Sequence, residues 1–222
     1  MREFLIAVCP VTIWVIVACE IVVAVMLFRL AKRTKQTGAL LGGLITAGLI
    51  IDALIMGLGA FLSANTVVAI SPVRFIAHGL LIPLLFPICG YALKLKKPAM
   101  VCVWIFTVLL MAAGLAQALA TKLELKEFAG VIRCASGEGT PFWADMISYG
   151  LSFGAVLPLL VAGIIVWIKN KKPYLFLSGF FMFAFSALGP ATGNMDLIFF
   201  ISLFGELLMV LFIYLTFSTE RD

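Results

Sequence analysis

Charged residues are scarce in this chain of 222 residues: Lys, Arg, Asp and Glu together make up only 12% of it. An ordinary soluble domain carries about a quarter of such residues, which cover its surface. Hydrophobic residues instead reach 64%, and the mean hydropathy is +1.18. The chain therefore lacks the polar surface that a separate soluble domain would need, and the composition predicts an integral membrane protein.

The apolar segments also lack the alternation of apolar and polar residues that transmembrane strands require. They run continuously instead, and a helix needs ~20 such residues to cross a hydrocarbon core of ~30 Å. The sequence therefore predicts an all-α protein, with seven transmembrane helices packed in one bundle over the whole chain. The expected spans are 4–28, 39–62, 73–93, 99–120, 146–168, 174–188 and 197–217.

Basic residues are missing from most connections on one side of the membrane. Eleven of the sixteen follow spans one, three, five and seven: Arg29, Lys32, Arg33, Lys35, Lys94, Lys96, Lys97, Lys169, Lys171, Lys172 and Arg221. The positive-inside rule then places the amino terminus outside and the carboxyl terminus inside the cell membrane. Attraction of these clusters to anionic lipid explains the net charge of +5, so no nucleic-acid partner is expected.

Of five cysteines, three lie within spans and are expected to act as small apolar residues. Cys9 lies near the external end of the first span, and Cys134 lies in the longest connection, 121–144, on the same side. That side is oxidising, which favours a disulfide between Cys9 and Cys134. Two free thiols are the alternative, because the sequence does not give the distance between them.

Histidine is nearly absent, and this excludes several kinds of chemistry. A single histidine, His78, cannot supply both axial ligands of a haem. No run of Cys, His and carboxylate has the spacing of a zinc site. The serines lack the elbow motif of hydrolases, and no glycine-rich loop is followed by the lysine that phosphate binding requires. We therefore expect no metal and no cofactor, and the sequence favours a role other than catalysis.

Five titratable or charged residues nevertheless lie inside the spans: Glu20, Asp52, Arg74, His78 and Glu206. Each charge at the centre of a membrane helix costs ~2.5–3.5 kcal/mol on insertion scales, so each is a candidate for function. Asp52 and Glu206 fall near the midplane, and Arg74 and His78 share one helix face. We expect Asp52, His78 and Glu206 to face a shared, water-accessible interior, with Arg74 paired to an acid or capping the outer entrance.

Such a polar interior predicts transport or binding of a proton, a cation or another small molecule. The alternative is structural: protonated acids can hydrogen-bond between helices, and Arg74 can anchor its helix at the interface. A further alternative is an accessory subunit that packs against another membrane protein through glycine seams. Lipid is the one certain partner, and an oligomer is compatible with the sequence.

Span three carries one resemblance to a known family. Arg74 is followed nine residues later by Pro83-Leu84-Leu85. With seven helices and an external amino terminus, this pattern resembles the corresponding helix of microbial rhodopsins over about a dozen residues. The family's retinal-bearing lysine is missing, since span seven has Leu208 near that place, and Ala77 replaces the usual acid. The resemblance therefore implies a ligand sensor with a rhodopsin-like bundle that lacks retinal.

The charge asymmetry makes a direct prediction about topology. A tag placed before Met1 should be labelled by a membrane-impermeant reagent on intact cells. A tag after Asp222 should be labelled only after permeabilisation. The basic clusters that follow spans one, three, five and seven keep these connections and the carboxyl terminus inside. Labelling of both ends from the same side would mean that the number of spans is even.

Overall fold

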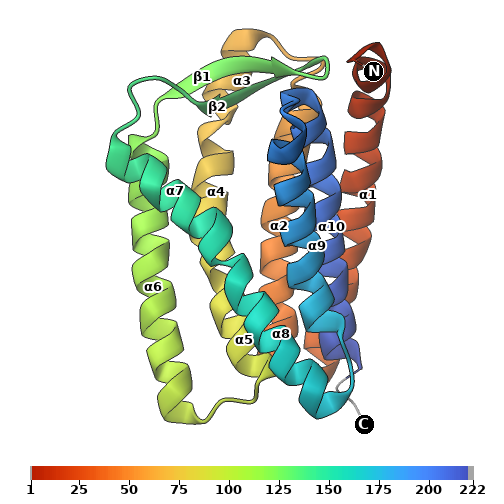
Figure 1. Ribbon diagram of the computed structural model, residues 1–222, viewed down its shortest axis with the longest axis vertical. Helices are drawn as coiled ribbons and strands as arrows, with labels where there is room; N and C mark the ends of the chain where they lie inside the picture. The colour runs from red at the N-terminus through yellow and green to blue at the C-terminus, as the bar shows by residue number, and fades with distance from the viewer. Residues whose placement is uncertain (1, 220–222) are drawn as a thin grey trace.

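The computed structural model describes residues 2–219, and for 2, 187–192, 195 and 198 it describes the backbone alone. Within these residues the chain is mostly helical, with one two-stranded sheet (Figure 1). The elements are α1 (Arg2–Thr34), α2 (Thr37–Leu58), α3 (Ala64–Ile70), α4 (Pro72–Leu81), the 3-10 turn η1 (Ile82–Leu84), α5 (Leu85–Ala92), α6 (Lys97–Ala120), β1 (Leu123–Phe128), β2 (Val131–Ser136), α7 (Phe142–Gly154), α8 (Val156–Asn170), α9 (Tyr174–Thr192) and α10 (Met195–Ser218).

Six helical segments of the described chain are long and apolar enough to cross a membrane: Glu3–Thr34, Thr37–Leu58, Ala64–Ala92, Lys97–Ala120, Phe142–Asn170 and Phe199–Ser218. The apolar part of α9, Tyr174–Ser186, is shorter. Large apolar side chains also face outward, for example Val101, Ile105 and Leu109 along α6. An apolar helical bundle with this surface is that of a multi-pass membrane protein, as the composition predicts.

Two of these segments are broken near a proline. Pro83 cannot donate a hydrogen bond to the carbonyl of Gly79, and the helix continues there as the short turn η1. Pro158 likewise has no N–H to donate to the carbonyl of Gly154, where α7 ends; α8 begins two residues later at Val156. As Figure 1 shows, α7 consequently leans outward beside α6, whereas α8 returns towards α5. The bundle is thus wider at the end that holds the sheet.

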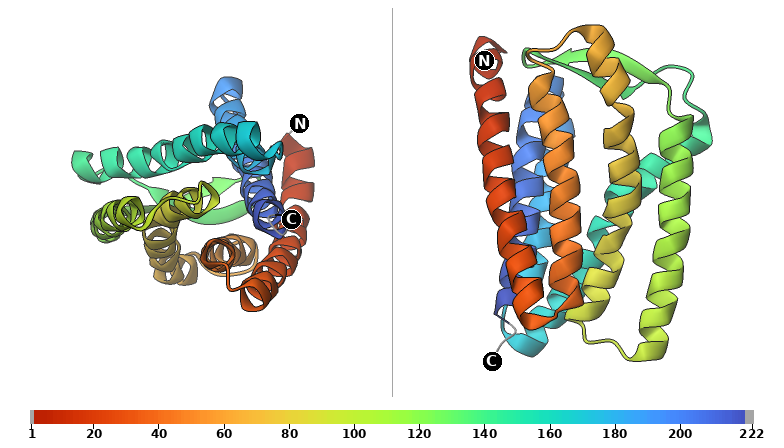
Figure 2. Two further views of the ribbon diagram at one scale, coloured as in Figure 1. Left: turned by 90° about the horizontal axis from the view of Figure 1, so that it is seen from below. Right: turned by 180° about the vertical axis from the view of Figure 1, so that it is seen from behind.

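Sequential helices are neighbours around the bundle, and α10 closes it against α1, α2 and α9 (Figure 2). The end away from the sheet is filled by apolar side chains. Leu85 and Ile88 of α5 pack there with Leu159 of α8 and Ile213 of α10, all fully buried. Close packing of these side chains leaves no polar path through this end of the bundle.

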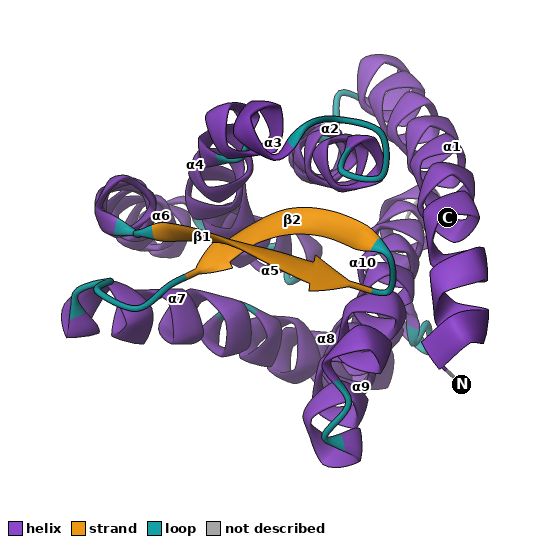
Figure 3. Cartoon of the chain, turned by 90° about the horizontal axis from the view of Figure 1, so that it is seen from above, coloured by secondary structure: helices purple, strands orange, loops and turns teal. Residues whose placement is uncertain are grey.

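The sheet is a β-hairpin within the connection 121–144, for which the sequence predicts no regular structure. The prediction of an all-α protein is therefore not fully correct. Ala129 and Gly130 form its two-residue turn with φ of +48° and +78°, the left-handed values of a type I′ turn. The N–H of Ala129 donates to Asp196 Oδ1 at 2.8 Å, which ties the turn to the start of α10. The hairpin therefore spans the end of the bundle from α6 and α7 to α10 (Figure 3).

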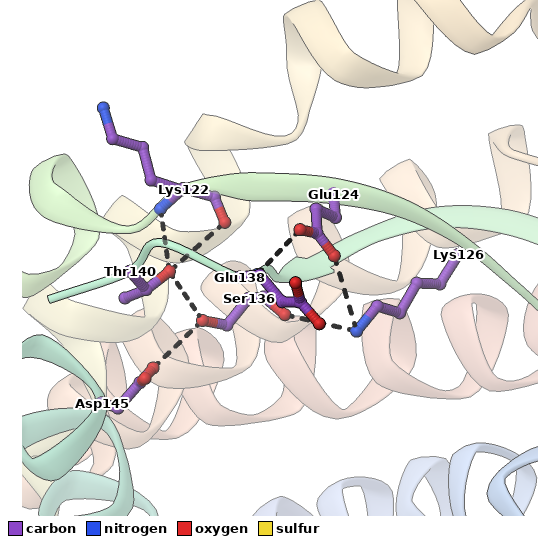
Figure 4. A network of polar contacts seen from close by, with 7 residues as sticks. All are labelled: Lys122, Glu124, Lys126, Ser136, Glu138, Thr140 and Asp145. Carbon is purple, nitrogen blue, oxygen red and sulfur yellow. Dashed lines mark hydrogen bonds and ion pairs between the residues drawn. The ribbon is translucent and has the colours of Figure 1, made fainter. Parts of the chain in front are cut away.

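The root of the hairpin is held by a polar network (Figure 4). Ser136 Oγ donates to Asp145 Oδ1 at 3.1 Å and also lies 3.1 Å from Thr140 Oγ1. The N–H of Lys122 donates to the same Thr140 hydroxyl at 3.1 Å. Because Asp145 belongs to α7, these bonds fix the hairpin to the leaning helix.

The disulfide expected between Cys9 and Cys134 is not formed, and both residues are buried free thiols. Cys9 packs in an apolar cluster with Phe128 and Val131, at the turn of the hairpin. Cys134 lies three residues beyond Val131 along β2 and does not belong to this cluster. A disulfide needs two Cα atoms within about 7 Å and side chains that point towards each other, and this is a tertiary property that the shared side of the membrane does not provide.

Glycine seams occur at places that spacing alone does not identify. Gly42 of α2 packs against Leu27 and Ile213, as its spacing from Gly38 suggests, but Gly150 and Gly154 face open space. One close approach of two helix backbones involves Gly79 of α4 and Gly114 of α6. A Cβ on Gly114 would lie 2.4 Å from the backbone oxygen of Gly79.

This seam makes a stability prediction. Gly114→Ala should lower the apparent melting temperature of the purified protein, because α4 and α6 must separate, and overpacking of this kind costs ~1–3 kcal/mol. Gly150→Ala is the matched control, since nothing lies within 4 Å of its added methyl group. Equal melting temperatures for the two variants in a thermal unfolding assay would contradict the backbone contact.

Candidate functional site

A cavity of about 410 Å³ lies beneath the hairpin, in the wide half of the bundle. It is bounded by α2, α4, α6, α7, α9, α10 and strand β2. Apolar side chains, including Leu49, Leu85 and Met209, line the part nearest the apolar core. The volume is within the usual range for small-ligand pockets, ~300–1,000 Å³.

Asp52 and Arg74 form a buried ion pair in the wall of this cavity. Arg74 Nε donates to Asp52 Oδ1, and both side chains are almost completely inaccessible. Arg74 Nη1 also donates to the backbone carbonyl of Cys134 at 3.2 Å. A single guanidinium therefore joins α2, α4 and β2, and of the two arrangements expected for Arg74 the structure has the ion pair.

His78 and Glu206 complete a compact cluster with Asp52. His78 lies one turn from Arg74 on α4, and Glu206 comes from the middle of α10. One ligand atom from each of Asp52, His78 and Glu206 lies within 4.8 Å of the others. Within the described residues no hydrogen bond or ion pair reaches the side chain of His78 or Glu206, and both keep part of their surface exposed. Three residues that are distant in sequence thus meet at the cavity.

Arg133 is a cavity residue that the sequence reasoning missed, because an arginine in an external connection looks solvated. It enters from β2, and its guanidinium lies 5.1 Å from the ring of Phe128 and 4.8 Å from that of Phe199. Nη1 lies 3.6 Å from the sulfur of Met56, whereas Nε is buried with no hydrogen-bond partner among the described residues. Burial, with the nearby charge of Arg74, lowers the pKa of Arg133 to about 10, so it stays charged at neutral pH.

Glu20 is the one predicted site residue that does not line the cavity. It belongs to α1, which lies against α2 and α10 but contributes no residue to the cavity wall. Its side chain is 1% exposed, and within the described residues neither carboxylate oxygen has a partner. Position along the span predicts how deep Glu20 lies in the membrane. It does not predict which neighbouring helices the side chain faces.

Hydroxyl and amide groups of α6, α7, α9 and α10 also line the cavity and were not predicted as site residues. They are Gln117 of α6, Ser148 and Ser152 of α7, and Ser186 and Ser202 of α9 and α10. Single serines within an apolar helix carry no signal of their own, since their hydroxyls often bond to the preceding turn. Ser152 and Ser202 do so here.

The arrangement supports exchange of protons or binding of a small polar ligand or cation. Two arginines face two carboxylates, and a histidine lies among them. The sequence predicts no metal site, because it has a single histidine and no closely spaced Cys, His and carboxylate residues. The fold gathers one imidazole and two carboxylates from three helices, so that argument does not hold.

No protein-family model matches the chain, and a search of curated proteins finds no match. The resemblance of span three to microbial rhodopsins therefore gains no support. Function is inferred from the cavity and its own residues.

The ion pair predicts a strong coupling between two residues. Asp52→Asn should destabilise the protein by roughly 3–5 kcal/mol, because it leaves the charge of Arg74 buried without its partner. Adding Arg74→Gln should recover part of that loss, giving a coupling energy well above the measurement error in a double-mutant cycle of unfolding. Additive effects of the two substitutions would show that the pair does not exist in the folded protein.

Proposed function

We propose that this protein spans the membrane seven times, with the hairpin outside, and moves protons or small cations through the cavity. The apolar α9 supplies the remaining span, reaching from a basic connection to the hairpin end. The basic clusters after α1, α5 and α8 all lie at the end opposite the hairpin, which supports this orientation (Figure 2).

The observation that carries the proposal is the convergence of Asp52, His78 and Glu206 on one cavity inside an apolar bundle. Titratable groups are costly in such a place, and they usually mark an ion or proton path. His78 and Glu206 have no protein partner among the described residues, so they are available to a proton or a ligand. A purely structural role would instead require hydrogen bonds between helices at these positions.

The apolar core between the cavity and the basic end gives the proposal a mechanism. Packed side chains such as Ile88 and Leu159 close the bundle on the side of the basic connections. The cavity lies on the hairpin side of this packed core. Movement across the membrane then requires α8 to separate from α5. The breaks next to Pro83 and Pro158 are the natural hinges, because hydrogen bonds along each helix are already interrupted there.

Binding of a small molecule without transport is the second candidate function. The cavity volume of about 410 Å³ favours it, since a proton path alone needs far less space. A sensor of this kind would change its cytoplasmic connections when a ligand binds, and it would show no net ion flux.

A flux assay tests the proposed transport. The full chain would be reconstituted in liposomes that contain a pH-sensitive dye, and a potassium diffusion potential would drive proton entry. We expect rapid acidification with the wild-type protein and a rate near that of empty liposomes for Glu206→Gln, which keeps the shape of the side chain but removes its titration. Expression and melting temperature should stay close to wild type.

Glu127→Gln is the control, because Glu127 is a carboxylate on the exposed face of β1 and lies outside the cavity wall. It should leave the flux intact. No flux above empty liposomes with the wild-type protein, for protons or for alkali cations, would exclude transport and leave ligand binding as the function.

A further inference from the structure

We propose that Asp52, His78 and Glu206 form a binding site for a divalent transition-metal ion of the zinc type. This inference rests on the proposed function in one respect, since it identifies the cation that the cavity accepts. Metal binding itself does not require transport.

The geometry of the three donors is the first argument. Their ligand atoms lie within 4.8 Å of one another, so small side-chain rotations bring all three to the ~2.0–2.2 Å that zinc requires of nitrogen and oxygen ligands. The donors come from α2, α4 and α10, which are held together by packing. The side chains of His78 and Glu206 have no competing partner among the described residues.

The donor set indicates the class of metal. An imidazole with two carboxylates suits zinc, cobalt, nickel, iron or manganese, whereas calcium and magnesium prefer oxygen ligands alone. Three protein ligands also leave a coordination position open. Structural zinc sites fill all four positions, so the set is that of an exchangeable or reactive ion.

Arg74 is a positioning residue for this site. Its Nε bond to Asp52 Oδ1 fixes the orientation of the carboxylate and leaves the second oxygen for the ion. Its Nη1 bond to the carbonyl of Cys134 fixes the guanidinium in turn. Supporting hydrogen bonds of this kind are common around metal-ligating carboxylates.

Arg133, unlike Arg74, lowers the affinity of the site for a metal ion. Its charge is held near the cavity between Phe128 and Phe199, and the charge of Arg74 already lies beside the carboxylate of Asp52. A divalent ion therefore brings net positive charge into the site, which lowers its affinity. A weakened site releases its ion readily, as a transported cation requires.

Zinc titration of the purified, chelator-stripped full chain tests the site. We expect saturable binding of one zinc ion per chain by isothermal titration calorimetry, and visible d–d bands when cobalt is used instead. His78→Gln and Glu206→Gln should each weaken binding by more than the roughly 10–100-fold that loss of a supporting residue costs. Calcium should give no saturable signal. Each variant's fold is checked by its melting temperature.

Two further variants make the outcome decisive. Arg133→Gln should bind zinc severalfold more tightly, because it removes an opposing charge, whereas a site for an anion would lose its ligand. Glu127→Gln, on the exposed face of β1, should bind as the wild type does. Absence of saturable zinc binding by the wild type, or unchanged binding in folded His78→Gln and Glu206→Gln, would overturn the metal site.

The metal site and the transport proposal can fail separately. Zinc binding without any ion flux would uphold the site and exclude transport. Proton flux without zinc binding would uphold transport and overturn the metal site.

Discussion

An ionised carboxylate inside an apolar bundle is costly unless an opposite charge is held beside it, and Asp52 is paired with Arg74. The pair fixes more than two side chains, because Arg74 also donates to the backbone of the hairpin at Cys134. Three elements that are far apart in sequence are therefore held in one place by one guanidinium. The position of the cavity, directly under the hairpin, follows from this contact and from the anchor between Ala129 and Asp196.

The shape of the bundle provides the space that these charges line. Because Pro83 and Pro158 interrupt their helices, α7 diverges at the hairpin end while α8 packs against α5 at the other. A fold with straight helices would bury the same residues in a packed interior, where unpaired groups such as His78 and Glu206 are costly. The two breaks thus open a cavity beside His78 and Glu206, so these polar groups are not buried in a packed apolar interior.

The hairpin contributes chemistry as well as cover. Arg133 reaches the cavity from β2, between two aromatic rings that partly replace its lost hydration. Its charge and that of Arg74 lie at the same cavity as the carboxyl groups of Asp52 and Glu206, so a visiting proton or cation changes the balance of charge within the site. Glu20 has no such surroundings. It lies outside the cavity wall, buried in the seam of α1 without a partner among the described residues.

The sequence by itself determined the membrane class and the approximate bounds of most of the apolar helices, because hydropathy and helical periodicity are local properties. It also identified four of the five charged or titratable residues that meet at the cavity. The tertiary structure alone decided which faces of α2, α4 and α10 meet, and it excluded Glu20 and added Arg133. It also left Cys9 and Cys134 as free thiols. Such outcomes depend on helix rotation, on the turn at Ala129 and Gly130, and on the breaks at Pro83 and Pro158. The prolines are visible in the sequence, but the direction in which each break turns its helix, and the faces that then meet, are set by packing between segments distant in sequence.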